Sequence, residues 1–300
     1  MASYVVMQGD VVEQLKMLDD DSIDVIATDP PYNLGMDEWD KWESDQAFRE
    51  WCYEWGVEAF RVLKPGGTIF AFSAGRTYHW MAIALSEAGF NTRDMIEWVY
   101  WGTMPRQKNL KSCHEPIYMG TKGKHKPLNV DACRVPLDKK SRTELEKMIV
   151  PNMPEGKHPG RKAYGGDGET KKYGTAIDNK SYQMNESGRH PFNVVTTTIT
   201  EATFPTNVID NKKPRGKESI KGHQTQKPVS VMKWMIELAS NKGDIVLDLF
   251  GGTGTTGQAA LEAGRNVVLI ERESDYVDII DNRLTPIVQK TAVDDEEALK

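Results

Sequence analysis

The residues best suited to chemistry begin with Asp29-Pro30-Pro31-Tyr32, which directly follows a short apolar run at residues 23–28. If that run is a strand of a parallel α/β sheet, ligands bind beyond its carboxyl end. The two prolines lack an N–H group and restrict the backbone to extended geometry, which leaves neighbouring carbonyl oxygens as acceptors. A carboxylate, an aromatic ring and such acceptors suit an aromatic amine, which can stack and donate its N–H protons. The alternative is a proline-rich strand exit with a packed tyrosine.

A glycine-rich turn, Asp248-Leu249-Phe250-Gly251-Gly252-Thr253-Gly254, lies between a second predicted strand and a predicted helix. Such a turn is typical of nucleotide sites, because glycines let the backbone approach a ligand closely. The spacing differs from that of a dinucleotide site, and no lysine follows as it does in a phosphate-binding loop. The turn therefore favours adenosine without a pyrophosphate. The next predicted strand ends at Glu271, whose carboxylate could bind ribose hydroxyls.

Two shorter motifs are weaker signals. His223-Gln224-Thr225-Gln226-Lys227-Pro228 precedes a predicted helix, where Thr225 could lie near the helix N-terminus and Lys227 could pair with a carboxylate. Gly9-Asp10 ends the first predicted strand, and the Asp10 carboxylate could accept a hydrogen bond from an adenine amine. Ordinary helix capping is the alternative interpretation of both.

These motifs are set in an alternation of strands and helices, which predicts a parallel α/β sheet. We expect strands at 4–8, 23–28, 68–73, 91–101, 115–119, 244–249 and 266–270, and helices at 11–18, 45–63, 76–88, 229–240, from the glycine turn to 261, and 274–288. From 121 to 221 little periodicity survives, which predicts an inserted, loop-rich module with a short helix at 144–149 and a strand at 193–199. Residues 291–300 form an acidic tail, which is expected to fray from 294 to 300.

Composition excludes several classes of protein. Hydrophobic residues make up 39% and charged residues 27% of the 300, which allows a sizeable core in a soluble chain. We see no apolar stretch long enough for a transmembrane helix and no secretion signal, so we expect a cytoplasmic protein. The three cysteines, Cys52, Cys113 and Cys133, form no CxxC pair, which argues against disulfides and a metal site.

The charge is unevenly distributed along the chain. Residues 105–222 carry 23 Lys and Arg against 13 Asp and Glu, a local net charge of +10, whereas the rest of the chain has a net charge of −16. A basic middle segment favours a nucleic-acid partner, and a solvated basic loop is the alternative.

Taken together, the ordered motifs resemble the permuted beta group of DNA amino-methyltransferases. In that family a DPPY motif precedes an FxGxG motif, with a target-recognition insertion between them. Leu63–Gly67 and His114-Glu115 also fall where the family has such segments, and the resemblance covers roughly residues 4–120 and 222–288. It implies a Rossmann-like fold, circularly permuted, whose seven-stranded, mostly parallel sheet has one reversed strand. The expected domains are 1–120 and 222–290 for catalysis and cofactor binding and 121–221 for target recognition.

The resemblance also implies an activity: methyl transfer from S-adenosylmethionine to adenine N6 in double-stranded DNA, after base flipping. Asp29 and the Pro30 carbonyl would accept the two amine N–H groups, and Tyr32 would stack on the base, with Pro31 completing the catalytic motif. No Pro-Cys dipeptide of the cytosine-C5 type occurs, so no covalent enzyme intermediate is expected. The implied cofactor-binding residues are Asp10, Phe250, Gly251, Gly254 and Glu271, with Thr225 and Lys227 near the methionine end and Asp248 in the same pocket.

Several alternatives stay open. Cytosine-N4 methylation shares the fold and chemistry, although the family usually has Ser for cytosine at the position of Asp29. RNA or a protein glutamine amide could be the substrate, and the chain could be a DNA-binding module that no longer catalyses. A homodimer and a cognate restriction endonuclease are further possible partners. The segment 35–42, with Trp39 and Trp42, could be an active-site lid, a dimer contact or packing over the sheet edge.

Overall fold

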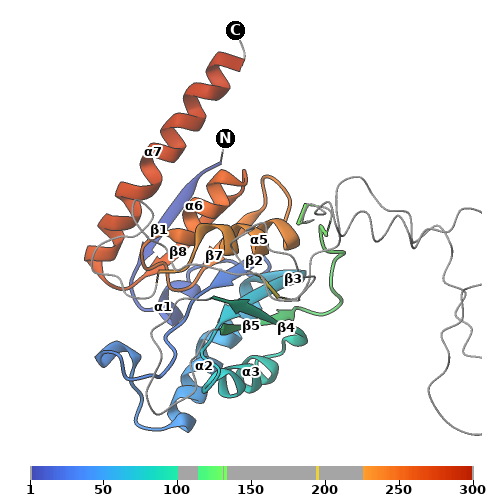
Figure 1. The fold of residues 1–300 in the computed structure, drawn as a ribbon, viewed down its shortest axis with the longest axis vertical. Coiled ribbons are helices and arrows are strands. Elements are labelled where there is room, and N and C mark those ends of the chain that lie inside the picture. Colours follow the sequence, from blue (N-terminus) through green and yellow to red (C-terminus); the bar gives the residue numbers. More distant parts are fainter. Residues whose placement is uncertain (1, 101–113, 131, 134–193, 196–225, 299–300) are drawn as a thin grey trace, which may run out of the picture. The chain divides into compact units, whose positions relative to one another are not determined.

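One mixed sheet organises the protein in a computed structural model, which describes residues 2–100, 114–130, 132–133, 194–195 and 226–298 (Figure 1). The chain divides into two units, and the described residues all belong to the unit made of 1–133, 192–202 and 206–300. The strands of the sheet are β1 (Tyr4–Gln8), β2 (Ile23–Thr28), β3 (Leu63–Phe72), β4 (Asn91–Val99), β5 (His114–Thr121), β6 (Val194–Val195), β7 (Ile245–Asp248) and β8 (Asn266–Glu271). The described helices are α1 (Val11–Leu15), the short 3-10 turn η1 (Glu38–Asp40), α2 (Asp45–Val62), α3 (Tyr78–Glu87), α5 (Val229–Ala239), α6 (Thr255–Glu262) and α7 (Ser274–Ala298).

The strand order is β1-β8-β7-β2-β3-β5-β4-β6. β5 runs antiparallel to both of its neighbours, β3 and β4, and the other pairs are parallel. This arrangement confirms the predicted α/β fold with one reversed strand. The two-residue strand β6 comes from the predicted insertion and pairs with Glu97 and Trp98 of β4, so it adds an eighth strand to the seven expected.

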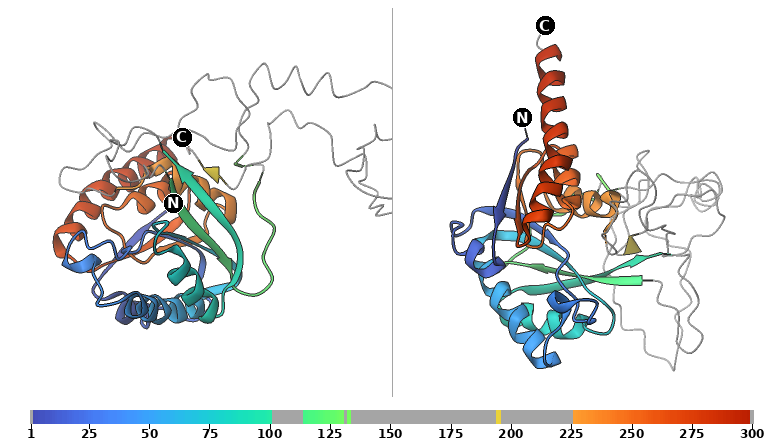
Figure 2. Two further views of the ribbon diagram at one scale, coloured as in Figure 1. Left: turned by 60° about the horizontal axis from the view of Figure 1, so that its bottom comes forward. Right: turned by 90° about the vertical axis from the view of Figure 1, so that its left-hand side faces the viewer.

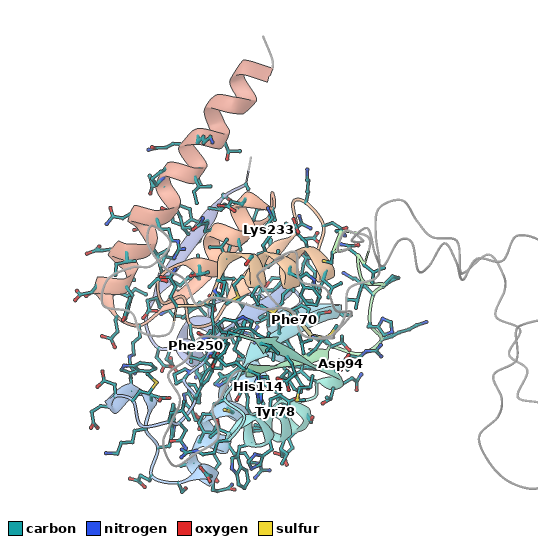
Figure 3. The ribbon with its side chains drawn as sticks, viewed as in Figure 1. Phe70, Tyr78, Asp94, His114, Lys233 and Phe250 are labelled. Atoms are coloured by element: carbon teal, nitrogen blue, oxygen red, sulfur yellow. The ribbon has the colours of Figure 1, made fainter. Side chains whose placement is uncertain are left out.

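Helices cover both faces of the sheet. α1, α2 and α3 lie on one face, and α5, α6 and α7 lie on the other, as Figures 1 and 2 show. Two apolar clusters fill the two interfaces, one containing Trp55 and Ile69 and the other Phe70 and Trp98. Ile69 and Phe70 are adjacent in β3 and belong to opposite clusters, because side chains of a strand alternate between faces. Phe70 is labelled near the middle of the sheet in Figure 3.

Some predicted element boundaries were wrong. Helix α1 ends at Leu15 rather than at 18, and β3 begins at Leu63, directly after α2, rather than at 68. Proline and glycine at 65–67 favour a stop in the chain, but the two glycines join the sheet. Gly66 N–H donates to Lys122 O at 2.7 Å, and Lys122 N–H donates to Gly67 O at 3.2 Å. The packing there is close, since a Cβ on Gly67 would lie 2.8 Å from Leu63.

The C-terminal prediction was also wrong, because α7 continues to Ala298 instead of fraying from Asp294. Helix-forming Ala and Glu residues dominate its last turns, and the helix passes through Pro286. Figure 2 shows α7 continuing well past the sheet. The predicted helix at 144–149 lies outside the described residues. Of the predicted strand at 193–199, only Val194–Val195 is described.

Composition led to expectations about membrane-spanning helices and about the cysteines. None of the described helices is long and apolar enough to cross a lipid bilayer. Cys52 and Cys133 are buried free thiols, and Cys113 lies outside the described residues.

Strand direction determines what meets at the site. β1, β2, β3, β7 and β8 run the same way, so their carboxyl ends share one edge of the sheet. The reversed strand β5 begins at that edge, where its Ile117 pairs with Phe72 at the end of β3. β4 also runs this way, because it too is antiparallel to β5. The edge therefore collects the residues that follow the parallel strands and those at the start of the reversed strand.

Candidate active site

A cleft opens at this edge of the sheet and contains about 1310 Å³ of empty space, part of it open to solvent. Most of the residues singled out in the sequence line it together: Asp10, Asp29, Pro30, Pro31, Tyr32, Lys227, Asp248, Phe250, Gly251 and Glu271. The two main motifs, far apart in the chain, thus share one cavity.

Two of the predicted site residues are not among those that line the cleft. Gly254 is the N-cap of α6 with φ at +75°, and a Cβ there would lie 3.3 Å from Ile280. Its left-handed backbone turns the chain into the helix beneath α7, and its predicted place in the cofactor site stays a prediction. Thr225 lies outside the described residues, as do His223 and Gln224.

The Asp29 carboxylate is held by two donors. The Tyr32 hydroxyl donates to Asp29 Oδ1 at 2.6 Å, and Lys227 Nζ lies 2.6 Å from Asp29 Oδ2. A second carboxylate, Glu115 at the start of β5, accepts from the same Tyr32 hydroxyl at 3.2 Å and lies 3.4 Å from Lys227 Nζ. The result is a cluster of two carboxylates, one ammonium and one phenol.

Lys227 is the positive centre of this cluster and is 4% exposed. Burial alone would lower its pKa, but the charges of Asp29 and Glu115 raise the pKa of Lys227 above its ordinary value. Its ammonium also lies 5.2 Å from the Tyr32 ring centroid and 5.3 Å from that of Phe72, within the range of cation–π attraction. Lys227 therefore stays charged while buried. Burial and the two neighbouring carboxylates raise the pKa of Tyr32 well above 10, which keeps its hydroxyl a donor.

The turn that carries the motif is held by residues outside it. The Asp40 carboxylate, 2% exposed, accepts four backbone N–H groups, those of Tyr32 and Asn33 at 2.7 Å, Leu34 at 3.0 Å and Met36 at 3.3 Å. On the other side, Thr77 Oγ1 donates to the Tyr32 carbonyl at 2.8 Å, and Arg76 donates to the Asn33 carbonyl at 2.7 Å. These contacts fix the direction in which Asp29 and Tyr32 leave the sheet.

The glycine-rich turn after β7 is organised by carboxylates. Asp248 accepts from Thr28 Oγ1 at 2.8 Å and from Phe250 N–H at 3.2 Å, and burial raises the pKa of Asp248 to about 7. Glu271 Oε2 accepts the Gly252 N–H at 2.7 Å, and its other oxygen accepts the Glu273 N–H at 2.9 Å. In a phosphate-binding loop the glycine N–H groups point at the ligand. Here the Gly252 N–H is already bound to Glu271, which disfavours a phosphate.

Asp10 combines both interpretations considered for it. It lines the cleft, and its Oδ1 caps α1 by accepting the N–H groups of Val12 at 2.9 Å and Glu13 at 3.3 Å. The capping role is what the structure shows directly. Its predicted contact with a ligand stays a prediction.

An aromatic wall closes one side of the cleft. Phe250, labelled in Figure 3, comes from the turn after β7, and its ring centroid lies 5.6 Å from that of Trp51. Trp51 packs in turn against Trp42 at 4.6 Å. Trp39 also lines the cleft but is 46% exposed. Trp42 therefore lines the cleft as part of an aromatic cluster, whereas Trp39 lines it with much of its side chain exposed.

Sequence reasoning missed Asp40, Glu115 and the wall residue Trp51. Glu115 had been noted as part of a family segment but given no role. The available signal was strand direction: a residue that precedes a reversed strand reaches the same edge as residues that follow parallel strands. Asp40 had no comparable signal, since it is one of several acidic residues in a polar segment.

Comparisons with known proteins agree with this geometry. Residues 23–282 match the N6/N4 family described as DNA methylase. The chain is 29% identical over 280 residues to the type II methyltransferase M.HpaI of Haemophilus parainfluenzae, covering 92% of this chain and 72% of that protein. It is 28% identical over 278 residues to the DNA adenine methyltransferase YhdJ of Escherichia coli (strain K12), covering 91% of this chain and 79% of that protein.

Solved structures share the fold at low identity. A complex of M1.HpyAVI with SAM matches with a TM-score of 0.54 at 22% identity, over 94% of this chain and 100% of that one. The cytosine-N4-specific PvuII DNA methyltransferase matches with a TM-score of 0.59 at 16% identity, over 97% and 93%. Because the family match spans most of its length and the cleft brings the family's motifs together, the chain belongs to the N6/N4 DNA methylase family.

Proposed function

We propose that this DNA methylase transfers a methyl group from S-adenosylmethionine to the exocyclic N6 amine of adenine in double-stranded DNA, after the base has flipped out of the helix. The observation that carries the proposal is the meeting of Asp29-Pro30-Pro31-Tyr32 with the glycine-rich turn at one cleft. The first motif suits an aromatic amine, and the second suits an adenosine cofactor.

The charges of the cleft fit S-adenosylmethionine. The described lining residues include six carboxylates, Asp10, Asp29, Asp40, Asp248, Glu271 and Glu273, against the basic side chains Lys227 and Arg272. An acidic lining attracts the sulfonium and ammonium groups of this cofactor and repels a pyrophosphate. The Gly252 N–H, which is already bonded to Glu271, also disfavours a pyrophosphate. Asp10, Phe250, Gly251 and Glu271 would hold the adenosine part, and Asp248 would lie near the methionine part.

When bound, the cofactor supplies an electrophilic methyl group on a sulfonium sulfur. The residues of the chain have to present the amine nitrogen, whose lone pair is delocalised into the base. Asp29 and the Pro30 carbonyl accept its two N–H groups, which favours a pyramidal nitrogen with its lone pair directed at the methyl group. Holding both reactants in line can supply roughly 7–11 kcal/mol of the barrier reduction.

The base must first leave the DNA stack, which costs a few kcal/mol. Stacking on the Tyr32 ring can recover about 1–3 kcal/mol of that cost. Tyr32 and the glycine-rich turn line the same cleft, so a base stacked on Tyr32 would lie beside the cofactor.

Cytosine N4 is the second candidate target, since a cytosine-N4 enzyme shares the fold. Asp29 favours adenine, because the family resemblance associates Asp with adenine and Ser with cytosine at this position. The similarity to the DNA adenine methyltransferase YhdJ supports the same choice.

We also propose roles for the rest of the chain. Residues 1–120 and 222–290 form the catalytic part, and the basic residues within 121–221 bind phosphates and read bases. A cytoplasmic location fits an enzyme that acts on DNA. If the insertion binds DNA through phosphates, raising the salt concentration should weaken DNA affinity steeply; a flat salt profile would contradict this role. A homodimer and a cognate endonuclease are tested by sedimentation and by restriction of unmethylated DNA in the source cells.

The first experiment is to incubate the protein with unmethylated genomic DNA and S-adenosylmethionine labelled in the methyl group, and then to resolve the nucleosides. Label in N6-methyladenine is expected. Label in N4-methylcytosine would overturn the choice of base, and no label with intact cofactor binding would move the substrate to RNA or protein or leave a binding module. Asp29→Ala should abolish transfer while cofactor and DNA binding persist, with Asp37→Ala as the matched control in the same segment.

A further inference from the structure

The residue that stands out beyond the known motifs is Glu115, the second carboxylate of the Asp29 cluster. It is 15% exposed in its side chain and enters the site from the start of the reversed strand β5. It does not line the cleft with the motif residues. It nevertheless contacts the same two donors that hold Asp29.

The state of Asp29 poses a chemical problem for the proposed reaction. Both of its oxygens already accept short bonds at 2.6 Å, one from the Tyr32 hydroxyl and one from the Lys227 ammonium. An N–H group of the base can use only the lone pairs that these two donors leave free, and the charge-assisted bond from Lys227 draws on the negative charge of Asp29. An engaged Asp29 is therefore a weaker acceptor for the substrate than an Asp29 released from these donors.

Glu115 offers those donors another acceptor. Its Oε2 lies 3.2 Å from the Tyr32 hydroxyl and 3.4 Å from Lys227 Nζ. A movement of less than about 1 Å would bring both distances to the 2.6–2.9 Å of a good charge-assisted bond. Since the cluster holds two carboxylates and one ammonium, Lys227 stays neutralised whichever carboxylate it contacts more closely.

We propose that Glu115 is a positioning residue that takes over the Tyr32 hydroxyl and the Lys227 ammonium when Asp29 engages the target amine. The inference rests on the proposed function, because it concerns how Asp29 becomes available to the base. Glu115 itself touches neither base nor cofactor. Its effect is confined to the methyl-transfer step, so cofactor affinity does not depend on it.

Glu115→Gln tests this directly, since it keeps the shape and an acceptor oxygen but removes the charge that draws Lys227 away from Asp29. The full-length protein is mixed with duplex DNA and labelled S-adenosylmethionine in a single turnover. We expect the transfer rate to fall about 10- to 100-fold, the range supplied by one charge-assisted hydrogen bond. The cofactor Kd from calorimetry should stay within about 2-fold, because no cofactor contact is removed.

The matched control is Glu97→Gln, on the neighbouring strand β4. Glu97 pairs with Pro116 and Trp98 pairs with Glu115, so Glu97 and Glu115 point to opposite faces of the sheet. Glu97→Gln should leave the rate unchanged. Glu115→Asp keeps the charge but withdraws the oxygens by one methylene, and it should also slow transfer with an unchanged Kd. This variant provides the test if Glu115→Gln does not fold.

A double variant separates the proposed exchange from a structural role. Tyr32→Phe keeps the ring but removes one of the two donors that bind Asp29. Glu115→Gln should then cost less in the Tyr32→Phe background than in the wild type, whereas a purely structural role predicts the same cost in both.

The proposal is overturned if Glu115→Gln transfers methyl groups within about 2-fold of the wild-type rate. It is equally overturned if the cofactor Kd weakens in parallel with the rate, or if the cost is the same in both backgrounds. A wild-type protein that binds cofactor but forms no methylated base would instead refute the proposed function, before any variant of Glu115 is made.

Discussion

Asp40 is the residue whose removal should disturb the site most without touching a reactant. Its carboxylate is buried and accepts four consecutive or near-consecutive N–H groups from the turn that carries Tyr32. Asn33 in that turn has a left-handed φ of +57°, which is unfavourable for most residues without such support. Asp40→Ala should therefore loosen the turn and displace Asp29 and Tyr32.

The free-energy cost of Asp40→Ala depends on those hydrogen bonds to Asp40 that water cannot easily replace. Tyr32 and Asn33 donate at 2.7 Å from positions that are partly or fully buried, whereas Leu34 and Met36 are exposed and can bind water instead. A hydrogen bond to a charged group contributes about 1.5–3 kcal/mol. Counting the two buried donors alone, we expect a local cost of about 3–6 kcal/mol, a large share of the roughly 5–15 kcal/mol that holds a typical domain folded.

Amide hydrogen exchange measures this cost where it arises. A loss of about 3 kcal/mol corresponds to exchange on the order of 100-fold faster, and we expect it at the amides of Tyr32 and Asn33 together with a large loss of methyl transfer. The control is Asp37→Ala, because the carboxylate of exposed Asp37 accepts only the Glu38 N–H among the hydrogen bonds that the structure describes. It should cost about 1 kcal/mol or less. If the amides of Tyr32 and Asn33 exchange at the same rate in Asp40→Ala as in the wild type, the hydrogen bonds to Asp40 do not support the turn and the prediction is refuted.

Three further substitutions probe the core of the site. Burial raises the pKa of Asp248 to about 7, so the folded state binds this proton more tightly than the unfolded chain does, and stability should fall as the pH rises from about 4 to 7. This loss in the free energy of unfolding is at most about 4 kcal/mol. Urea unfolding of Asp248→Asn should therefore depend less on pH than that of the wild type. An identical pH dependence in both proteins would contradict the raised pKa of Asp248. Gly257→Ala in α6 places a Cβ 2.5 Å from Leu284 of α7. The overpacking should destabilise the protein by about 1–3 kcal/mol, measured by the urea midpoint. In the control Gly243→Ala the added Cβ meets no atom within 4 Å, so any loss of stability comes from the backbone conformation alone. Lys227→Met leaves two carboxylates without their ammonium and should cost about 3–5 kcal/mol at pH 8, with part of the stability regained at pH 5; no regain would mean that the charges are not the cause.

Much of the fold could be predicted because the strands next to the site carry their own signal. β2 is a short apolar run followed by Asp29, β8 is one that ends at Glu271, and both were predicted closely. The start of β3 could not be predicted in the same way. Pro65 and the two glycines after it are local stop signals, but the sheet accepts them because Gly67 allows close packing against Leu63. Tertiary packing there outweighs local preference.

The site was predicted for residues that a motif identifies and missed for residues that support them. Asp29, Tyr32 and Lys227 were found from their motifs, and the expectation that Lys227 would pair with a carboxylate is confirmed by its contact with Asp29. The expected cofactor contact of Gly254 stays a prediction, because a glycine needed for a left-handed turn resembles one needed for a ligand. A sequence does not distinguish these two uses of glycine.

Asp40 and Glu115 explain why the sequence motif predicts the chemistry of the site but not its geometry. Asp40 lies eight positions from Tyr32, and Glu115 lies 83 positions from it. Asp40 is selected from neighbouring acidic residues only when the turn folds around it, and Glu115 reaches the site only because β5 runs against its neighbours. Both facts depend on the fold as a whole. The tetrapeptide Asp29-Pro30-Pro31-Tyr32 on another parallel sheet would keep its acceptors and its ring, but its carboxylate would lack the groups that hold it and those that release it.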